Sequence, residues 1–373
     1  MDALILTCGT GGGHNAAARA LEEELLRRGH RVRLMNPYTL HSEQLAARID
    51  QAYIRLVQAS PAAFGVVYRL GNLYRCLPGR SPVYFINARM VPFMEKFLQE
   101  NHFDVILMTH LFPGEILTNM KGKGMRVPPF LFVSTDYACI PFTEETDCDG
   151  YVIPAEDLSG DYTARGLSAE RLYPMGIPVR RCFAESISRE KAREQLGLSA
   201  QMRYILVAGG SMGAGGMLST MRLLDRHFRS DGGTRFIVIC GSNQRLSRQL
   251  QEILGDRAII LEHTDRMDLY LKACDLFLTK PGGLSSTEAA VSGVPIIHIA
   301  PIPGCETLNA NYFGERGMGV PAIHHQEELI PAIERMSVPE NCAAMVEAQR
   351  RINPNAASDI CDLAERFAAQ RSR

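Results

Sequence analysis

The sequence predicts an α/β protein built from two doubly wound parallel sheets, and two observations support this. The chain has 373 residues, more than one hydrophobic core normally organises. The order strand, glycine-rich loop, helix, strand also occurs twice, and strands that alternate with helices form parallel sheets. We therefore expect two domains, residues 1–176 and 177–373, joined near Met175–Phe183, with the last helix able to pack back on the first domain.

The first copy of this pattern begins with Ala3–Thr7, a short apolar run that suits a buried parallel strand. Glycines within Gly9–Gly13 form the loop, and apolar residues at helical spacing predict a helix over His14–Arg28. Gly29 is a typical residue to end that helix. The further strands expected in this half are Val32–Met35, Val105–Met108, Phe130–Val133 and Gly150–Ile153.

The second copy begins with the strand Tyr204–Ala208, followed by a glycine loop, Gly209–Gly216, and a helix, Leu218–Phe228. Sheets of this kind bind ligands at the carboxyl ends of their strands. The further strands expected here are Phe236–Cys240, Ile259–Leu261, Leu276–Leu278 and Pro295–Ile299.

Composition excludes several classes of protein. The formal net charge of -1 offers no general attraction for nucleic acid. The ten cysteines contain no C-x-x-C pair, which favours reduced thiols over disulfides or a zinc site. A strand follows the first residues at once, and no apolar run approaches the ~20 residues of a membrane span. We expect a cytoplasmic protein without a spanning helix; the sequence does not indicate an oligomeric state.

The glycine loops differ from the common nucleotide-binding motifs. In the first, His14 stands where a dinucleotide fingerprint has its third glycine, and no suitable acidic residue follows. Neither loop ends in the Gly-Lys-Ser/Thr of a P-loop. The second loop, GGSMGAGG, would still present backbone N–H groups to a phosphate, without any lysine. The alternative is a turn that only packs helix on strand.

The stretch PGGLSSTEAAVSGVP predicts a second anion site. Gly282 and Gly283 allow a close approach of the backbone to a ligand. Hydroxyls at a helix start favour a pyrophosphate, and Glu288 in the first turn could accept hydrogen bonds from ribose. The alternative is a capping box, with Glu288 three residues after the first hydroxyl. The hydroxyl residues are Ser285, Ser286 and Thr287.

Asp147 and Asp149, in TDCDGY, superficially resemble the carboxylate pair of metal-dependent sugar transferases. They immediately precede the predicted strand at Gly150, where solvated carboxylates are common. We therefore expect no metal here.

The chain resembles the glycolipid-forming UDP-sugar transferases, that is, plant monogalactosyldiacylglycerol synthases and bacterial processive diacylglycerol glucosyltransferases. The likeness covers nearly the whole chain. It implies a GT-B fold, glycosyltransferase family 28-like, with two Rossmann-like domains facing across a cleft, acceptor in the first and UDP-sugar in the second. The motifs that carry it are GTGGGHNAAARALEEEL, THLFPGEIL, VSTDYACIPFTEETDCDGYVIP, GIPV, GGSMGAGG, TKPGGLSSTEA and PIPGCETLNANYF.

The resemblance implies roles for particular residues. Glu288 would bind ribose, and Cys305 replaces the family's usual glutamine, which leaves the hexose open because a thiol is a poor hydrogen-bond partner. The implied donor-binding residues are Gly210, Ser211, Met212, Gly213, Gly282, Gly283, Ser285, Ser286, Thr287, Glu288, Gly304, Glu306 and Asn309. The implied acceptor-side residues are Gly12, Gly13, His110 and Pro113.

The implied reaction moves a hexose from UDP to diacylglycerol or a glycosyl-diacylglycerol with inversion, needing no cofactor and no essential metal. His14 is the first candidate for the base because an unperturbed histidine titrates near neutrality. Asp136 is the second, as base or as partner of His14; His14 could instead be a packed helix-start residue. The alternatives are another lipid-linked acceptor, a UDP-N-acetylglucosamine 2-epimerase-like enzyme, or a non-catalytic UDP-sugar sensor.

A diacylglycerol acceptor would require docking on an anionic membrane surface, on the inner face of the cell membrane. The segment Tyr53–Phe97 mixes apolar and basic residues, as interfacial segments do. The alternative is amphipathic helices that pack on a sheet. The arginines are Arg55, Arg69, Arg75, Arg80 and Arg89, and the apolar residues are Ile54, Leu56, Val57, Phe64, Val66, Val67, Leu70, Leu73, Phe85, Ile86, Met90, Val91, Phe93 and Met94.

Overall fold

The computed structural model of the protein describes residues 1–9, 11–59, 65, 68, 71, 73–74, 79–209, 216–241, 243–323 and 326–371. The chain forms two compact units. The first comprises Met1–Arg181, Pro303–Cys305 and Asn355–Arg373, and the second comprises Cys182–Ile302 and Glu306–Pro354.

The first unit contains a six-stranded parallel sheet in the order β2-β1-β3-β4-β5-β6. In its centre, Leu4 pairs with Arg33 on one side and with Ile106 on the other. The strands expected from apolar runs are confirmed to within a residue, whereas the short edge strand β6 has no such signal. The strands are β1 Asp2–Leu6, β2 Arg31–Met35, β3 Val105–Met108, β4 Phe130–Val133, β5 Gly150–Ile153 and β6 Leu172–Pro174.

Helices cover both faces of this sheet, which is why its strands are continuous apolar runs. Leu21 and Leu25 of α1 and Ile360 of α17 share one core cluster with the sheet, and α6 packs against β3 and β4. The helices are α1 Gly12–Arg27, α2 Glu43–Ala59, α4 Pro82–Asn87, α5 Val91–Glu100, α6 Leu111–Gly122, α7 Ser159–Thr163 and α17 Ala356–Arg371. The 3₁₀ turns are η1 Pro37–Leu40, η2 Ala88–Met90, η3 Thr143–Glu145, η4 Glu156–Leu158 and η5 Ala169–Arg171.

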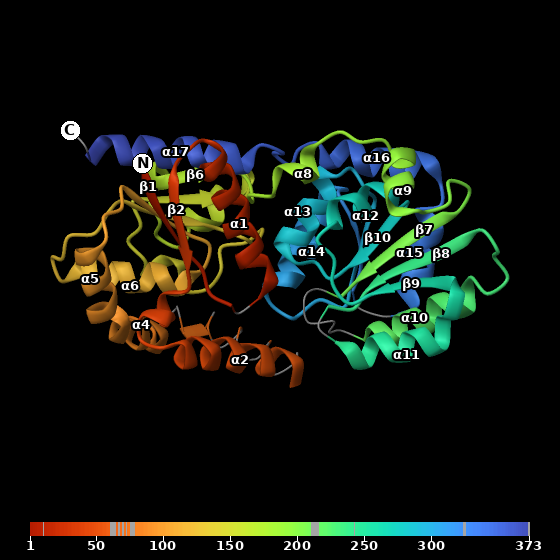
Figure 1. The fold of residues 1–373 in the computed structure, drawn as a ribbon, viewed down its shortest axis with the longest axis horizontal. Coiled ribbons are helices and arrows are strands. Elements are labelled where there is room, and N and C mark those ends of the chain that lie inside the picture. The colour runs from red at the N-terminus through yellow and green to blue at the C-terminus, as the bar shows by residue number, and fades with distance from the viewer. Residues whose placement is uncertain are drawn as a thin grey trace. The chain divides into compact units, whose positions relative to one another are not determined.

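Arg28 ties α17 to α1, although α17 follows the second unit in the chain (Figure 1). Its guanidinium bonds Glu24 within the same turn at 2.8 Å and Glu365 of α17 at 3.1 Å. It also donates to the backbone oxygen of Ser358 at 2.8 Å. Packing and charge together hold α17 in the first unit.

The second unit contains another six-stranded parallel sheet, in the order β12-β11-β10-β7-β8-β9. Leu278 in β10 pairs with Val207 on one side and Ile297 on the other. The predicted strands are confirmed to within two residues, and the fold class is confirmed for both halves. The strands are β7 Arg203–Ala208, β8 Thr234–Ile239, β9 Ala258–Leu261, β10 Leu276–Thr279, β11 Ile296–Ile299 and β12 Val320–Ala322.

Helices α10 and α11 lie below these strands in Figure 1, and α9 and α16 lie above them. Met221 of α10, Leu250 of α11 and Ile333 of α15 join the strands in one core cluster. The helices are α8 Arg181–Ala184, α9 Arg189–Leu196, α10 Met217–His227, α11 Gln244–Leu254, α12 Met267–Ala273, α13 Gly283–Val291, α14 Cys305–Glu315, α15 Leu329–Arg335 and α16 Pro339–Gln349, with 3₁₀ turns η6 Gly255–Arg257 and η7 Gln326–Glu328.

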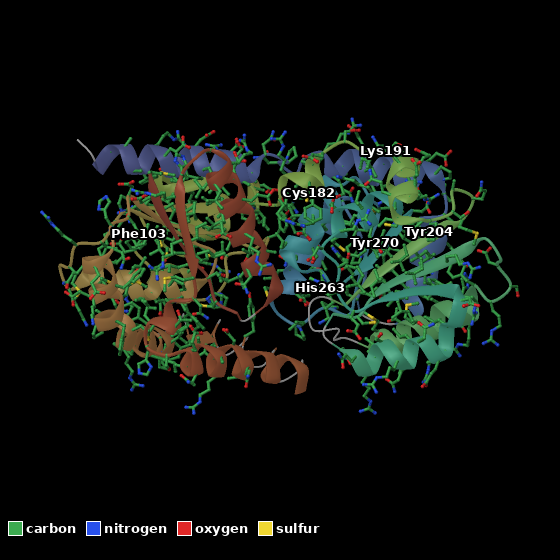
Figure 2. The ribbon with its side chains drawn as sticks, viewed as in Figure 1. Phe103, Cys182, Lys191, Tyr204, His263 and Tyr270 are labelled. Atoms are coloured by element: carbon green, nitrogen blue, oxygen red, sulfur yellow. The ribbon has the colours of Figure 1, made fainter. Side chains whose placement is uncertain are left out.

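A buried ion pair anchors α9 to the second sheet. Arg193 lies 2.7 Å from Asp275, and its guanidinium lies over the ring of Tyr204, which Figure 2 labels on β7. Asp275 also accepts the Tyr204 backbone N–H at 2.8 Å, so both charges have further partners. A buried ion pair needs these additional hydrogen bonds, because otherwise the loss of hydration would destabilise the fold.

Within the described part of the chain, every helix is too short or too polar to traverse a lipid bilayer. This finding agrees with the absence of a long apolar run in the sequence.

The Glu24 carboxylate gives a pH prediction. Hydrogen bonds from Arg27 and then Arg28 outweigh burial and lower its pKa from 4.5 to about 2. A lowered pKa adds stability above the unfolded value, and that stability is lost as pH falls from about 4.5 through 2. After allowance for solvent screening, Glu24→Gln should lower the free energy of unfolding by about 1–2 kcal/mol at pH 7. Denaturant melts should show the difference vanish near pH 2, and a constant difference at all pH values would contradict this account.

Candidate active site

Three polar residues gather where the strand order of the first sheet reverses, between β1 and β3. His14 is the third residue of α1, which follows β1. Thr109 directly follows β3, and Thr135 follows β4 after one residue. Loops after such strands diverge at the reversal and leave a crevice for ligands. The structure therefore places His14 where the sheet topology expects a functional group.

Two hydrogen bonds fix the ring of His14. Its Nδ1 lies 2.8 Å from the backbone oxygen of Thr109 and 2.9 Å from Oγ1 of Thr135. Thr109 returns a bond from its own Oγ1 to the backbone oxygen of His14 at 3.0 Å. A carbonyl oxygen can only accept, so Nδ1 carries the proton in the neutral ring. The lone pair is then on Nε2, the nitrogen able to take a proton.

The charge state of His14 suits a base. Burial lowers its pKa below the usual 6.5, while the Asp136 carboxylate and the Thr109 carbonyl partly oppose that effect. The ring is therefore neutral at pH 7. Asp136, predicted as base or partner, is partly exposed and acts on His14 through its charge.

His110, predicted on the acceptor side, is the N-cap residue of α6. Its Nδ1 accepts the Phe112 backbone N–H at 3.2 Å, which caps the helix start. Its ring lies edge to face with His14 at 4.8 Å between centroids, and burial, then His14, hold its pKa well below 6.5. Pro113 is buried in the first turn of α6, whereas Gly12 is exposed and Gly13 partly exposed. Of the four, the two glycines are the ones that a ligand can reach most readily.

In the second unit the strand order reverses between β7 and β10. The loop after β7 carries the predicted diphosphate residues Gly210, Ser211, Met212 and Gly213, which lie outside the described residues. The loop after β10 is described in full and leads into α13. The predicted donor-binding residues that can be located there are Gly282, Gly283 and the polar residues of α13.

The capping-box alternative for Glu288 is wrong. Helix α13 begins at Gly283 with Gly282 as its N-cap, and no side chain in the described part of the chain caps it. Glu288 is the sixth helical residue and lies in the second turn rather than the first. Its side chain is partly exposed, as is that of Ser285.

The other two hydroxyls of α13 are used inside the unit. Ser286 is fully buried and its Oγ lies 2.9 Å from Nε2 of His298 on β11. Thr287 is also fully buried and donates to the backbone oxygen of Gly283 at 2.7 Å. These side chains hold α13 in place, whereas Ser285, the third of these hydroxyl residues, is partly exposed.

Of the predicted sugar contacts, Asn309 is buried, whereas Gly304 and Glu306 are partly exposed. Asn309 on α14 is fully buried and donates to the Pro281 backbone oxygen at 3.0 Å, so it supports the loop before α13. Glu306 accepts the backbone N–H of Ile302 and is partly exposed. Gly304 has a φ of 119°, in the left-handed region that favours glycine.

Several site residues were missed by the sequence reasoning. Thr109 and Thr135 orient His14, and the available signal was a hydroxyl just beyond a buried strand at the sheet reversal. His298 is a histidine inside the apolar strand Ile296–Ile299, and burial lowers its pKa to about 3, so it is neutral. Lys280 follows β10 and is only 8% exposed.

Asp147 and Asp149 are engaged by cations of the protein. Lys121 lies 3.1 Å from Asp147 and 3.3 Å from Asp149, and Arg171 lies 2.6 Å from Asp147. Burial alone would raise the pKa of Asp147, but Arg171 and Lys121 lower it. Among the described residues there is no group of three or more histidine, cysteine or acidic side chains that could hold a metal ion.

The segment predicted to dock on membranes is only partly described. Leu73, Phe85 and Ile86 are 66%, 61% and 55% exposed, and Arg89 is exposed too. Met90, Val91 and Met94 are buried, so including them in the docking surface is wrong. Arg80 donates a hydrogen bond to the Glu145 backbone oxygen, and its guanidinium lies over the Tyr84 ring. Outside the described side chains lie Ile54, Arg55, Leu56, Val57, Phe64, Val66, Val67, Arg69, Leu70 and Arg75.

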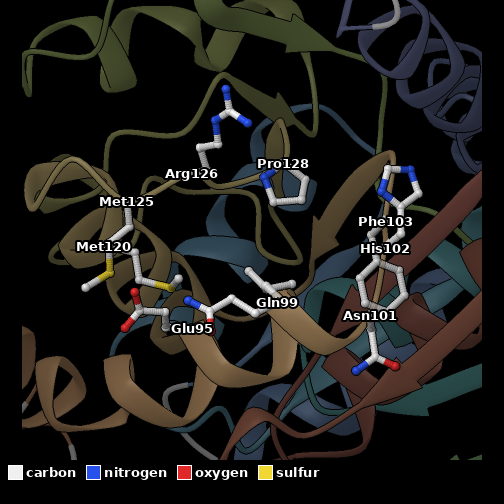
Figure 3. Close-up of a pocket in the computed structure, with 10 residues that line it drawn as sticks. Glu95, Gln99, Asn101, His102, Phe103, Met120, Met125, Arg126 and Pro128 are labelled. Carbon is white, nitrogen blue, oxygen red and sulfur yellow. The ribbon is translucent and has the colours of Figure 1, made fainter.

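A cavity of about 360 Å³ lies in the first unit, at the ends of the strands opposite to those that hold His14 (Figure 3). Phe103 and Pro128, which line it, precede β3 and β4, so the cavity adjoins the amino ends of these strands. Met120 and Met125 supply apolar lining. The cavity is therefore separate from the edge that holds His14.

Comparisons with known proteins cover both halves of the chain. Residues 14–179 match the family model of monogalactosyldiacylglycerol (MGDG) synthase, and residues 204–360 match the glycosyltransferase family 28 C-terminal domain. The processive diacylglycerol beta-glucosyltransferase of Bacillus subtilis (strain 168) is 27% identical over 346 residues, 91% of this chain and 87% of that protein.

Solved structures share the fold. The match to Acinetobacter baumannii MurG has a TM-score of 0.65 at 16% identity and covers 98% of this chain and 99% of that one. The match to UDP-GlcNAc 2-epimerase from Neisseria meningitidis, bound to UDP-GlcNAc, has a TM-score of 0.63 at 13% identity and covers 97% and 99%. Because transferases and epimerases share this architecture, it alone does not choose between them.

Replacing Asn309 tests whether this residue supports the fold. Asn309→Ala leaves the buried oxygen of Pro281 without this donor, so the free energy of unfolding should fall by about 1–3 kcal/mol. Asn341→Ala is the matched control, since Asn341 bonds the Arg335 oxygen at an exposed position, and should cost about 0.5 kcal/mol or less. Urea denaturation measures both, and equal small losses would leave Asn309 without a structural role.

Proposed function

We propose that this chain, which belongs to the UDP-sugar-dependent hexosyltransferases of the monogalactosyldiacylglycerol synthase and glycosyltransferase family 28 type, transfers a hexose to diacylglycerol or a glycosyl-diacylglycerol. The product would be a membrane glycolipid. The relatives named as processive diacylglycerol beta-glucosyltransferases support this choice of acceptor.

One observation carries the chemistry: a neutral His14 whose lone pair is fixed on Nε2. The acceptor hydroxyl gives its proton to Nε2 as its oxygen forms a bond to the anomeric carbon. The bond from that carbon to UDP breaks, and its electron pair leaves with the diphosphate. A single displacement from the opposite face inverts the anomeric configuration.

Asp136 makes this proton transfer more favourable. Its charge raises the pKa of His14 and therefore stabilises the imidazolium that forms. The hydrogen bonds to Thr109 and Thr135 keep the ring in one orientation throughout. Positioning of this kind lowers the barrier because the base need not be ordered during the reaction.

The donor is assigned to the second unit. Glu288, partly exposed in the second turn of α13, would accept hydrogen bonds from the ribose hydroxyls. The uncapped start of α13 and the loop Gly210–Gly213 would hold the diphosphate through backbone N–H groups. Gly304 and Glu306 remain proposed sugar contacts.

Lipid analysis tests this function. Wild-type protein, diacylglycerol vesicles and a panel of UDP-sugars should yield hexosyl-diacylglycerol by mass spectrometry. His14→Ala should lower turnover by about 10²–10⁴ through loss of the base, with UDP affinity unchanged. No lipid product, together with donor epimerisation in the absence of acceptor, would favour a 2-epimerase instead. Turnover that survives in His14→Ala would make Asp136 the base to test.

The enzyme would reach its lipid acceptor as a peripheral protein on the inner face of the cell membrane. Phe85 and Ile86 project from α4 beside the exposed Arg89, with Phe93 following on α5. Apolar side chains at such a surface enter the acyl boundary while arginine meets anionic head groups. The buried bonds from Ser81 to Glu145 and from Asn87 to Glu115 fix α4 to the unit.

Vesicle sedimentation tests this docking surface. Phe85→Ser should weaken binding to anionic vesicles roughly 10-fold or more, because a buried phenyl group contributes about 1.5–3 kcal/mol. Leu26→Ser is the matched control, since Leu26 on α1 is 54% exposed, and should bind like wild type. Arg89→Gln should reduce binding about fivefold on anionic vesicles only. Equal losses for Phe85→Ser and Leu26→Ser would move docking elsewhere.

A further inference from the structure

Lys280 is a nearly buried lysine at the carboxyl end of β10. It is the first residue after the strand and is only 8% exposed. Among the residues that the structure describes, its ammonium forms neither an ion pair nor a hydrogen bond. Removal of a charge from water is unfavourable unless a partner balances it. The described protein does not supply that partner.

The position of Lys280 indicates what the partner is. The strand order of the second sheet reverses between β7 and β10, and Lys280 follows β10 at that reversal. Gly282 and Gly283 then begin α13, and among the described residues no side chain caps its first N–H groups. Those N–H groups have no partner within the helix, and the helix dipole favours negative charge beside them. An ammonium and a free helix start thus occupy the same short turn.

We infer that Lys280 binds the diphosphate of the nucleotide donor, an inference that rests on the function proposed above. The site favours a compact anion with several charges, because the lysine ammonium acts as a point charge and the helix start offers several donors. Glu288 lies one turn further along α13 and is acidic, so it suits neutral hydroxyls and disfavours phosphate. Charge therefore orders the donor along α13, with diphosphate at Lys280 and ribose at Glu288.

Lys280 also acts during the reaction. As the bond between the anomeric carbon and the diphosphate oxygen breaks, its electron pair stays on that oxygen and the negative charge there grows. An ammonium beside that oxygen stabilises the growing charge more than it stabilises the intact donor. Sequence reasoning expected the GGSMGAGG loop to hold phosphate without any lysine, so Lys280 adds a positive charge from a different turn, the one after β10.

Two ligands that differ only in the diphosphate separate the possible roles of Lys280. UDP and uridine are titrated against wild type, Lys280→Met and Lys280→Arg by calorimetry and NMR. Lys280→Met should weaken UDP about 10- to 100-fold and leave uridine unchanged, as for loss of one charge-assisted bond. Lys280→Arg should keep most of the UDP affinity. Lys191→Met is the charge-matched control, since Lys191 is an exposed lysine on α9 (Figure 2), and should bind both like wild type.

The outcomes distinguish this inference from the proposed function. Unchanged UDP affinity in folded Lys280→Met, or equal losses for UDP and uridine, would overturn the inference alone and make Lys280 a support of the loop. If wild-type protein binds neither ligand, the proposed function and the inference fail together. Unfolding temperatures of all variants confirm that each is folded.

Discussion

Strand order reverses once within each sheet, and there the connections after two neighbouring strands run to opposite faces. This constraint determines where polar side chains can lie at the ends of the strands without being covered by a helix. In the first sheet His14 and Thr109 lie at the reversal, and in the second the turn Lys280–Gly283 does. The central strands are buried and mostly apolar, as strands covered by helices on both faces are. The candidate functional groups of both units therefore lie at the carboxyl ends of strands next to these reversals.

Many polar side chains around these edges serve as supports rather than as ligands. Asn309 holds the loop before α13, Ser286 and His298 fix that helix to β11, and Thr109 fixes the ring of His14. Each bond satisfies a group that burial would otherwise penalise. A site held in this way keeps its geometry in the free protein, so less ordering remains to be done when a ligand arrives.

The sequence predicts most strands of both sheets well because buried parallel strands are continuous apolar runs. It also predicts His14 and Glu288 as site residues, because each lies in a motif next to a glycine turn, and their roles stay proposals. It fails for Ser286 and Asn309, whose motifs look ligand-binding although their side chains point into the unit. It fails for the register of α13 as well, since the capping box depends on which residue starts the helix. Burial of Lys280 has no local sequence signal because it depends on the surrounding elements.

The position of α17 has a consequence for how the protein is made. This helix supplies Ile360 and Leu363 to the core of the first unit and bonds Arg28, yet it is translated after the whole second unit. During synthesis, domains generally fold as the chain emerges, the earlier one first. Here the earlier unit keeps an open apolar face until α17, which ends at Arg371, has emerged from the ribosome. The unit that starts first is therefore completed last, and a nascent chain stalled before α17 would present that face to chaperones.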